Sequence, residues 1–195
     1  MSSPKTDLAT EQYDGTVAFI GGSSFLASSY LSSFDVIQVE TKFGPVVLRA
    51  NSNRTIYFVQ RHAANPAEPY SPPHLINHRA IMTALVSLNV RRVIAFGSVG
   101  ALKKTIPVGT LMIIDDYVQF DIISTFEYSK AGHLVPGLDK SLRTTIADTL
   151  SSINLPYGNG GVYYQSKGPR FETPAEIRTL ALTGDVVVMT CGHEA

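Results

Sequence analysis

The chain has 195 residues, 44% hydrophobic and 16% charged, so it is long and apolar enough to bury the core of one domain. Its 16 Lys and Arg residues balance its 16 Asp and Glu residues, which argues against nucleic acid or an anionic membrane surface as the main partner. The single cysteine, Cys191, excludes an internal disulfide, and no apolar run approaches the roughly 20 residues of a membrane-spanning helix, so we expect a soluble, cytoplasmic protein.

The first predicted element is a buried strand that runs into a turn of glycines and serines. Residues 1–14 are polar and predict a tail, which leaves residues 15–195 as one domain. The apolar run Thr16–Ile20 predicts the strand, and the turn at 21–24 (GGSS) closes it. The glycines let a ligand approach the backbone and Ser23 offers a hydroxyl, although the same residues equally suit a turn that only ends a strand.

A hairpin and a third strand follow and lead to two basic residues. The runs 36–40 and 46–50 flank a Gly-Pro turn and predict the hairpin, and 55–60 predicts the next strand. Arg61 and His62 come directly after that strand. A guanidinium beside an imidazole could hold an oxyanion, whereas such a pair at a strand end is more often simply solvated.

The middle of the chain combines a long loop, a helix and another strand. Residues 63–77 contain four prolines and cannot form a helix interior, and loops of this length are often functional or mobile. Apolar residues recur at helical spacing over 77–88, which predicts a helix with Asn77 as its N-cap. The strand 93–96 then ends in a second small-residue turn, which contains Ser98.

A further strand, a helix and a strand are predicted at 110–114, 138–153 and 162–165. Asp115 and Asp116 follow the first of these strands. Two adjacent acids could ligate a metal, but no other His, Asp or Glu cluster lies at metal-ligand spacing. We therefore favour a solvated strand end there and expect no metal site.

The last stretch predicts a capped helix and a final strand. Thr173 precedes Pro174 and has Glu176 three residues later, a pattern typical of a helix N-terminus, and the helix should run to about Leu182. The strand 186–190 ends in a hydroxyl. Apolar strands that alternate with helices predict a single α/β domain with a mixed central sheet flanked by helices.

Small hydroxyls and cations recur where the predicted strands end. If those ends converge, they form a site for a small anion, and phosphate is the obvious candidate. An aromatic ring at Phe171 could stack on a flat ligand, and the adjacent Glu172 could accept from ring N–H groups. The residues predicted to bind the anion are Ser23, Arg61, His62, Ser98 and Thr190.

Between Ile20 and Ala195 the chain contains, in this order, the motifs IGGSS, QRH, PPHLINHRA, GSVGAL before IPVG, GVYYQSKGPRFETPAEI and DVVVMT. In these motifs, in their order and nearly in their spacing, it resembles the trimeric class of purine nucleoside phosphorylases. The resemblance is greatest to the branch of S-methyl-5′-thioadenosine and methylthioinosine phosphorylases. It implies the nucleoside phosphorylase fold and a homotrimer.

The resemblance also implies a role for each candidate residue. The five anion-binding residues named above fall on phosphate-binding positions, with a catalytic role for His62. Met189 falls under the ribose, Phe171 stacks on the base, and Glu172 holds the purine as a second catalytic residue. His133 matches a histidine that reaches into a neighbouring subunit's site.

The implied reaction is phosphorolysis, in which inorganic phosphate attacks the anomeric carbon of a purine nucleoside. S-methyl-5′-thioadenosine is the expected substrate, and no cofactor beyond phosphate as co-substrate is expected. The protein would stabilise an oxocarbenium-like sugar electrostatically, without a covalent nucleophile. A nucleoside phosphorylase that prefers 6-oxopurines is an alternative, because Glu172 suits such a base.

Three departures from the family pattern bear on activity. Ser24 stands where the family usually has glycine, and His193-Glu194 replaces Pro-Glu. Family chains continue with a strand whose Asp or Asn contacts purine N7, so the resemblance implies a domain that is incomplete at Ala195. The second alternative is therefore a truncated or catalytically decayed paralogue that binds nucleoside or phosphate without turnover.

Overall fold

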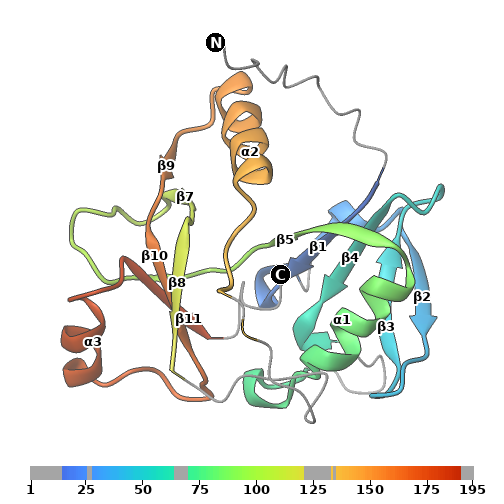
Figure 1. The fold of residues 1–195 in the computed structure, drawn as a ribbon, viewed down its shortest axis with the longest axis horizontal. Coiled ribbons are helices and arrows are strands. Elements are labelled where there is room, and N and C mark those ends of the chain that lie inside the picture. Colours follow the sequence, from blue (N-terminus) through green and yellow to red (C-terminus); the bar gives the residue numbers. More distant parts are fainter. Residues whose placement is uncertain (1–14, 26–27, 64–69, 121–132, 134, 190–195) are drawn as a thin grey trace, which may run out of the picture.

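The strands of this computed structural model form two larger sheets that lie side by side and one small sheet (Figure 1). The structure describes residues 15–25, 28–63, 70–120, 133 and 135–189, so the predicted tail at 1–14 lies outside it. The predicted α/β class is confirmed. None of the helices in the described part of the chain combines the length and apolar character needed to cross a membrane.

The first sheet has five strands in the order β2-β3-β4-β1-β5. Strand β1 lies between β4 and β5 and is parallel to both, so the carboxyl ends of these three strands meet at one edge. The predicted hairpin is confirmed as the antiparallel pair β2 and β3. The bounds are β1 Thr16–Gly21, β2 Asp35–Val39, β3 Val46–Ala50, β4 Ile56–Gln60 and β5 Val90–Ala95.

Helix α1, His78–Ser87, packs against this sheet and closes the main core (Figure 1). It begins as predicted, because the side chain of Asn77 accepts a hydrogen bond of 3.1 Å from the backbone N–H of Ala80. Its buried face includes Ile81 and Leu85, four residues apart, as a helix with one apolar face requires. The core therefore lies between α1 and the strands that end at the shared edge.

Leu85→Ala is expected to lower the free energy of unfolding by about 2–5 kcal/mol, because it leaves a cavity in a site only 1% exposed. Urea unfolding measures this as a lower midpoint at unchanged slope. Val86→Ala is the matched control, since Val86 on the same helix is 73% exposed and its loss should change stability by no more than about 0.5 kcal/mol. Equal effects of the two substitutions would contradict the packing.

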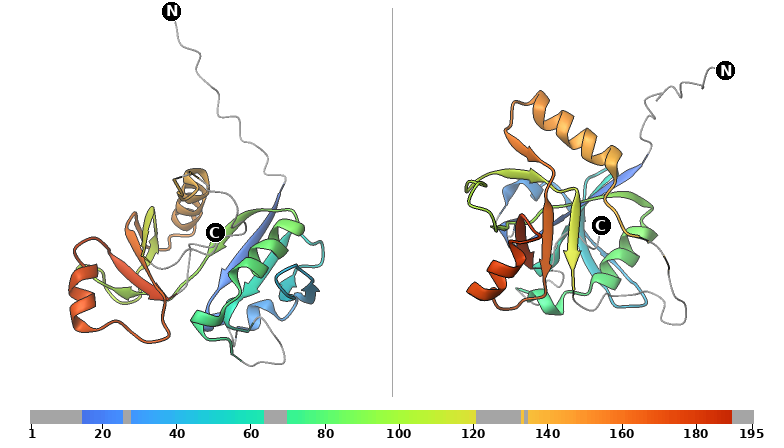
Figure 2. Two further views of the ribbon diagram at one scale, coloured as in Figure 1. Left: turned by 60° about the horizontal axis from the view of Figure 1, so that its bottom comes forward. Right: turned by 60° about the vertical axis from the view of Figure 1, so that its left-hand side comes forward.

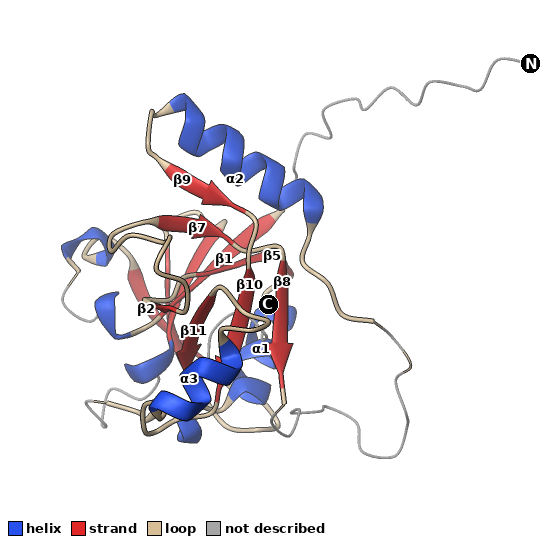
Figure 3. Cartoon of the chain, turned by 90° about the vertical axis from the view of Figure 1, so that its left-hand side faces the viewer, coloured by secondary structure: helices blue, strands red, loops and turns tan. Residues whose placement is uncertain are grey.

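The second sheet has four strands in the order β6-β11-β10-β8, with β10 parallel to β11 and β8. A small parallel sheet of β7 and β9 lies near helix α2, at one end of the second sheet (Figure 3). Helix α3 lies at the other end of the second sheet. The strands are β6 Gly100–Ala101, β7 Leu111–Ile113, β8 Asp116–Gln119, β9 Tyr157–Asn159, β10 Val162–Ser166 and β11 Val186–Met189; the helices are α2 Lys140–Ser152 and α3 Pro174–Leu180.

The strands are thus divided among two mixed sheets and one small parallel sheet, where the sequence predicted one central mixed sheet. The division falls at the second small-residue turn. The N–H of Phe96 still bonds to the carbonyl of Ile20 at 2.8 Å, after which the chain leaves β1 and resumes as β6 against β11. Figure 2 shows this segment crossing from one sheet to the other. The turn that contains Ser98 therefore joins the two halves of the molecule.

Candidate active site

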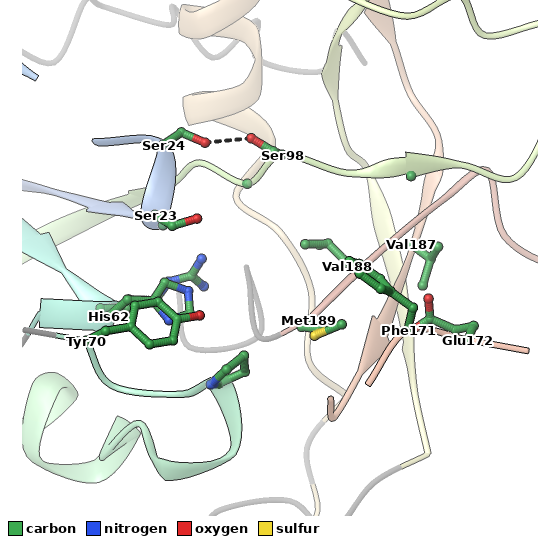
Figure 4. Close-up of a pocket in the computed structure, with 15 residues that line it drawn as sticks. Ser23, Ser24, His62, Tyr70, Ser98, Phe171, Glu172, Val187, Val188 and Met189 are labelled. Atoms are coloured by element: carbon green, nitrogen blue, oxygen red, sulfur yellow. Dashed lines mark hydrogen bonds between the residues drawn. The ribbon is translucent and has the colours of Figure 1, made fainter. Parts of the chain in front are cut away.

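A cavity of about 230 Å³ lies between the carboxyl edge of the first sheet and strand β11 (Figure 4). Parallel strands bring their carboxyl ends to the same edge, which is where open α/β sheets bind ligands. The turns after β1, β4 and β5 form one wall, and β11 with the segment before α3 forms the other. The predicted residues on the lining are Ser23, Arg61, His62, Ser98, Phe171, Glu172 and Met189.

Arg61 and His62 are buried in the wall formed by the first sheet, with 2% and 7% of their surface exposed. The alternative of a solvated basic pair is therefore wrong for this chain. A Cβ atom placed on Gly22 would lie 3.2 Å from Nη2 of Arg61 and 4.0 Å from Nε2 of His62. Glycine at this position keeps both nitrogens accessible from the same point beside the turn.

The orientation of His62 follows from its contacts. Its Nδ1 lies 2.9 Å from the carbonyl oxygen of Ser71, and its ring stacks on Tyr70 with centroids 5.2 Å apart and planes 8° apart. A carbonyl can only accept, so we assign the proton to Nδ1. Nε2 then faces Gly22 and can accept a proton, or donate one when the imidazole is charged.

Three serine hydroxyls line the same cavity as these basic groups. Ser23 and Ser24 come from the short 3-10 helix Ser23–Phe25 after β1, and Ser98 comes from the turn after β5. The hydroxyls of Ser24 and Ser98 are hydrogen-bonded at 2.8 Å (Figure 4). This wall thus combines a buried positive charge with hydroxyl donors, which suits a small oxyanion.

The opposite wall is apolar and carries one carboxylate. Met189 and Val188 end β11, while Phe171 and Glu172 come from the segment before α3 (Figure 4). The Phe171 ring is 84% exposed, so a face is available for stacking. Gly168 has φ of +66°, and a Cβ on it would lie 2.8 Å from Sδ of Met189, so the backbone there has no room for a side chain.

A capping box and an ion pair fix the segment that carries Phe171 and Glu172. Thr173 caps α3 and Glu176 completes the box, with the Thr173 N–H donating to Glu176 Oε2 at 2.6 Å. Arg170 binds the same carboxylate in bidentate fashion at 2.7 and 2.8 Å. The Arg170 guanidinium, followed by the Thr173 N–H, lowers the pKa of Glu176 from 4.5 to about 2.

This lowered pKa predicts an acid-dependent contribution to stability. In the folded chain Glu176 stays ionised at pH values below the pKa that it has in the unfolded chain. The stabilisation by this carboxylate is therefore present above about pH 4.5 and is lost as the pH falls towards 2. The difference in melting temperature between the unaltered chain and Glu176→Gln should be largest above pH 5 and shrink by pH 3. Asp148→Asn, at an exposed position on α2, is the control. A difference that stays constant over this range would contradict the ion pair.

The remaining predicted residues fall outside this cavity. His133 is exposed and does not line the cavity, so its role towards a neighbouring subunit stays a prediction. Thr190 lies outside the described residues. Asp115 accepts from the N–H of Gly161 at 2.8 Å, which gives it a structural role. Among the described residues, no group of three His, Cys, Asp or Glu side chains could hold a metal ion.

No sequence pattern indicated a role for Tyr70, and Ser24 was recognised only as a departure from the family pattern. Tyr70 lines the cavity, and the N–H of the next residue, Ser71, bonds to the carbonyl of His62. No periodicity in the sequence predicts this contact. Ser24 could have been recognised as a second hydroxyl in its turn, but its partner comes 74 residues later.

Comparisons with known proteins agree with this architecture. A family model described as the phosphorylase superfamily matches residues 16–195. A probable 6-oxopurine nucleoside phosphorylase of Archaeoglobus fulgidus is 35% identical over 182 residues, covering 92% of this chain and 74% of the relative. A probable S-methyl-5′-thioinosine phosphorylase of Methanosarcina acetivorans is 33% identical over 180 residues, covering 89% and 67%.

The solved structures that are similar agree on the fold. Methylthioadenosine phosphorylase from Schistosoma mansoni in complex with adenine superposes with a TM-score of 0.74 at 22% identity, covering 90% of this chain and 74% of that one. At this identity the likeness concerns the fold alone. The family match over nearly the whole chain carries the assignment: the chain belongs to the phosphorylase superfamily.

Proposed function

We propose that the chain catalyses the phosphorolysis of a purine nucleoside. An oxygen of inorganic phosphate forms a bond to the anomeric carbon, and the bond from that carbon to purine N9 breaks. The electron pair leaves with the base, which takes up a proton, and the sugar becomes a pentose 1-phosphate. The sugar is oxocarbenium-like in the transition state, so a fixed anion beside it lowers the barrier electrostatically.

The observation that carries this proposal is the buried pair Arg61 and His62, whose side-chain nitrogens face one point beside Gly22. A buried guanidinium that lines a cavity beside an imidazole and hydroxyl groups suits an oxyanion as ligand. Ser23 and Ser98 would donate to the same anion. The sugar would then lie over Met189 and the base beside Phe171 and Glu172, on the opposite wall.

Glu172 favours a 6-oxopurine as the base. Hypoxanthine and guanine carry a hydrogen on N1, which a carboxylate can accept, whereas adenine presents a lone pair there. A carboxylate that receives such a bond gains a charge-assisted contact worth about 1.5–3 kcal/mol. The Archaeoglobus fulgidus relative, named as a probable 6-oxopurine nucleoside phosphorylase, supports the same preference.

S-methyl-5′-thioadenosine is the second candidate substrate. It is the substrate that the motif resemblance implies, and an S-methyl-5′-thioadenosine phosphorylase of Pyrococcus horikoshii is 31% identical over 183 residues. S-methyl-5′-thioinosine combines the methylthio group with a 6-oxo base and satisfies both arguments. We expect inorganic phosphate as the only co-substrate, a cytoplasmic homotrimer, and a place in purine or methionine salvage.

Base release from four nucleosides tests these alternatives. The purified chain is incubated with inosine, adenosine, S-methyl-5′-thioinosine and S-methyl-5′-thioadenosine, each with and without phosphate, and the free base is separated and quantified. The proposal expects phosphate-dependent release, fastest with the 6-oxo pair. Release from none of the four overturns it. Calorimetric binding of nucleoside without release would support the alternative of a binding module.

A further inference from the structure

The hydrogen bond between Ser24 and Ser98 joins the two turns that flank the proposed phosphate site. The two oxygens are 2.8 Å apart, both side chains line the cavity, and both residues are exposed to it. The turns follow β1 and β5, which are adjacent parallel strands. A side-chain bond between residues 74 positions apart therefore sits at the mouth of the anion site rather than in the core.

The bond restricts what the serine pair can offer a ligand. Two hydroxyls have two protons, and their mutual bond uses one of them. The hydroxyl that accepts this bond still has its own proton to donate. If Ser24 donates to Ser98, then Ser98 donates onward, and a hydroxyl that accepts one bond is a better donor in the next.

We propose that Ser24 is a positioning residue for phosphate: it donates to Ser98 and so orients and polarises the Ser98 hydroxyl towards the anion. The inference rests on the proposed function for the identity of the anion. The opposite polarity, with Ser98 donating to Ser24, would leave Ser98 with only lone pairs to face a negative charge. Because Ser98 is the member of the pair that the proposed function assigns to the anion, a bound anion selects the order Ser24, Ser98, anion.

Since Ser24 acts only through Ser98, substitutions at the two serines should lower phosphate affinity in a specific pattern. Loss of the Ser24 hydroxyl removes one neutral bond that competes with water, so phosphate affinity should fall about three- to tenfold. Loss of the Ser98 hydroxyl removes a bond to a charged ligand and should cost about 10- to 100-fold. Ser24→Ala should then have no further effect in the Ser98→Ala background.

The experiment titrates inorganic phosphate by calorimetry into the full chain and into Ser24→Ala, Ser98→Ala, the double variant and Ser24→Thr. Ser24→Thr keeps the hydroxyl and should restore affinity to within about twofold. Ser33→Ala is the matched control, since Ser33 is exposed on the same connection and does not line the cavity. A nucleoside titration should be unchanged in Ser24→Ala, which separates a role in phosphate binding from a general disturbance of the site.

Each result supports or overturns the proposed role of Ser24 or the proposed function. Weakened phosphate binding by Ser24→Ala, rescue by threonine and no added loss in the double variant support the inference. Equal phosphate affinity in Ser24→Ala and the unaltered chain overturns it and leaves the proposed function intact. Additive losses also overturn it, because Ser24 would then act independently of Ser98. Phosphate binding of this pattern without base release overturns the proposed function alone, and no phosphate binding to the unaltered chain overturns both.

Discussion

An Arg61→Met variant will bind inorganic phosphate at least about 30-fold more weakly than the unaltered chain, with a similar fall in kcat/KM for phosphate. Arg61 is 2% exposed, so its charge is poorly screened, and removing one partner of a buried charged contact costs about 2–5 kcal/mol or more. Methionine keeps much of the volume and removes only the charge and donors. Lysine should restore part of the binding, because it keeps the charge without the planar fork.

The matched control for this result is Arg178→Met, which removes an exposed arginine on α3 outside the cavity. It should leave phosphate affinity unchanged. Circular dichroism and a melting curve show whether each variant folds cooperatively. A folded Arg61→Met variant that binds phosphate as tightly as the control would remove Arg61 from the anion site.

Glu172→Gln will change which base the chain prefers. The glutamine keeps the shape of the side chain and can donate to adenine N1, while the charge-assisted bond to the N1–H of a 6-oxopurine is lost. We expect kcat/KM for inosine or S-methyl-5′-thioinosine to fall about 10- to 100-fold. The value for the corresponding 6-amino nucleosides should fall less or rise.

The measurement is the ratio of kcat/KM between a 6-oxo and a 6-amino nucleoside that share the same sugar. A ratio cancels losses common to both substrates, such as a small shift of the segment before α3. Glu40→Gln, at an exposed site away from the cavity, is the control and should leave the ratio unchanged. An unchanged ratio in Glu172→Gln would mean that the carboxylate does not face N1.

Local signals in the sequence predict the elements whose stability is set locally. Asn77 and Thr173 cap α1 and α3 because each side chain accepts a hydrogen bond from the backbone N–H three residues later. This spacing can be recognised in the sequence. The strand Asp116–Gln119 was missed because it is short and polar at its start, and its partner β10 lies more than 40 residues away. Such pairing depends on tertiary contacts that no local pattern records.

In the candidate site, too, local sequence signals predicted some features and tertiary packing determined the others. Strand ends and residue types predicted that Arg61 and Ser98 share one edge, because parallel strands align their carboxyl ends. Their environment could not be predicted, because the burial of Arg61 and the position of Gly22 beside its guanidinium are set by tertiary packing. The stacking of Tyr70 on His62 is likewise a tertiary contact that no local pattern records. The residue types at the strand ends suggest an anion site, and packing determines its geometry.

The most direct test of phosphorolysis follows the phosphorus atom. Phosphorus-31 NMR of the purified chain with inorganic phosphate and S-methyl-5′-thioinosine or inosine measures the inorganic phosphate signal and any sugar phosphate signal in the same sample. Phosphorolysis predicts that one pentose 1-phosphate appears for each base released, and that Arg61→Met strongly lowers both at the same enzyme concentration. Base released while the inorganic phosphate signal stays constant would mean hydrolysis and would contradict the account.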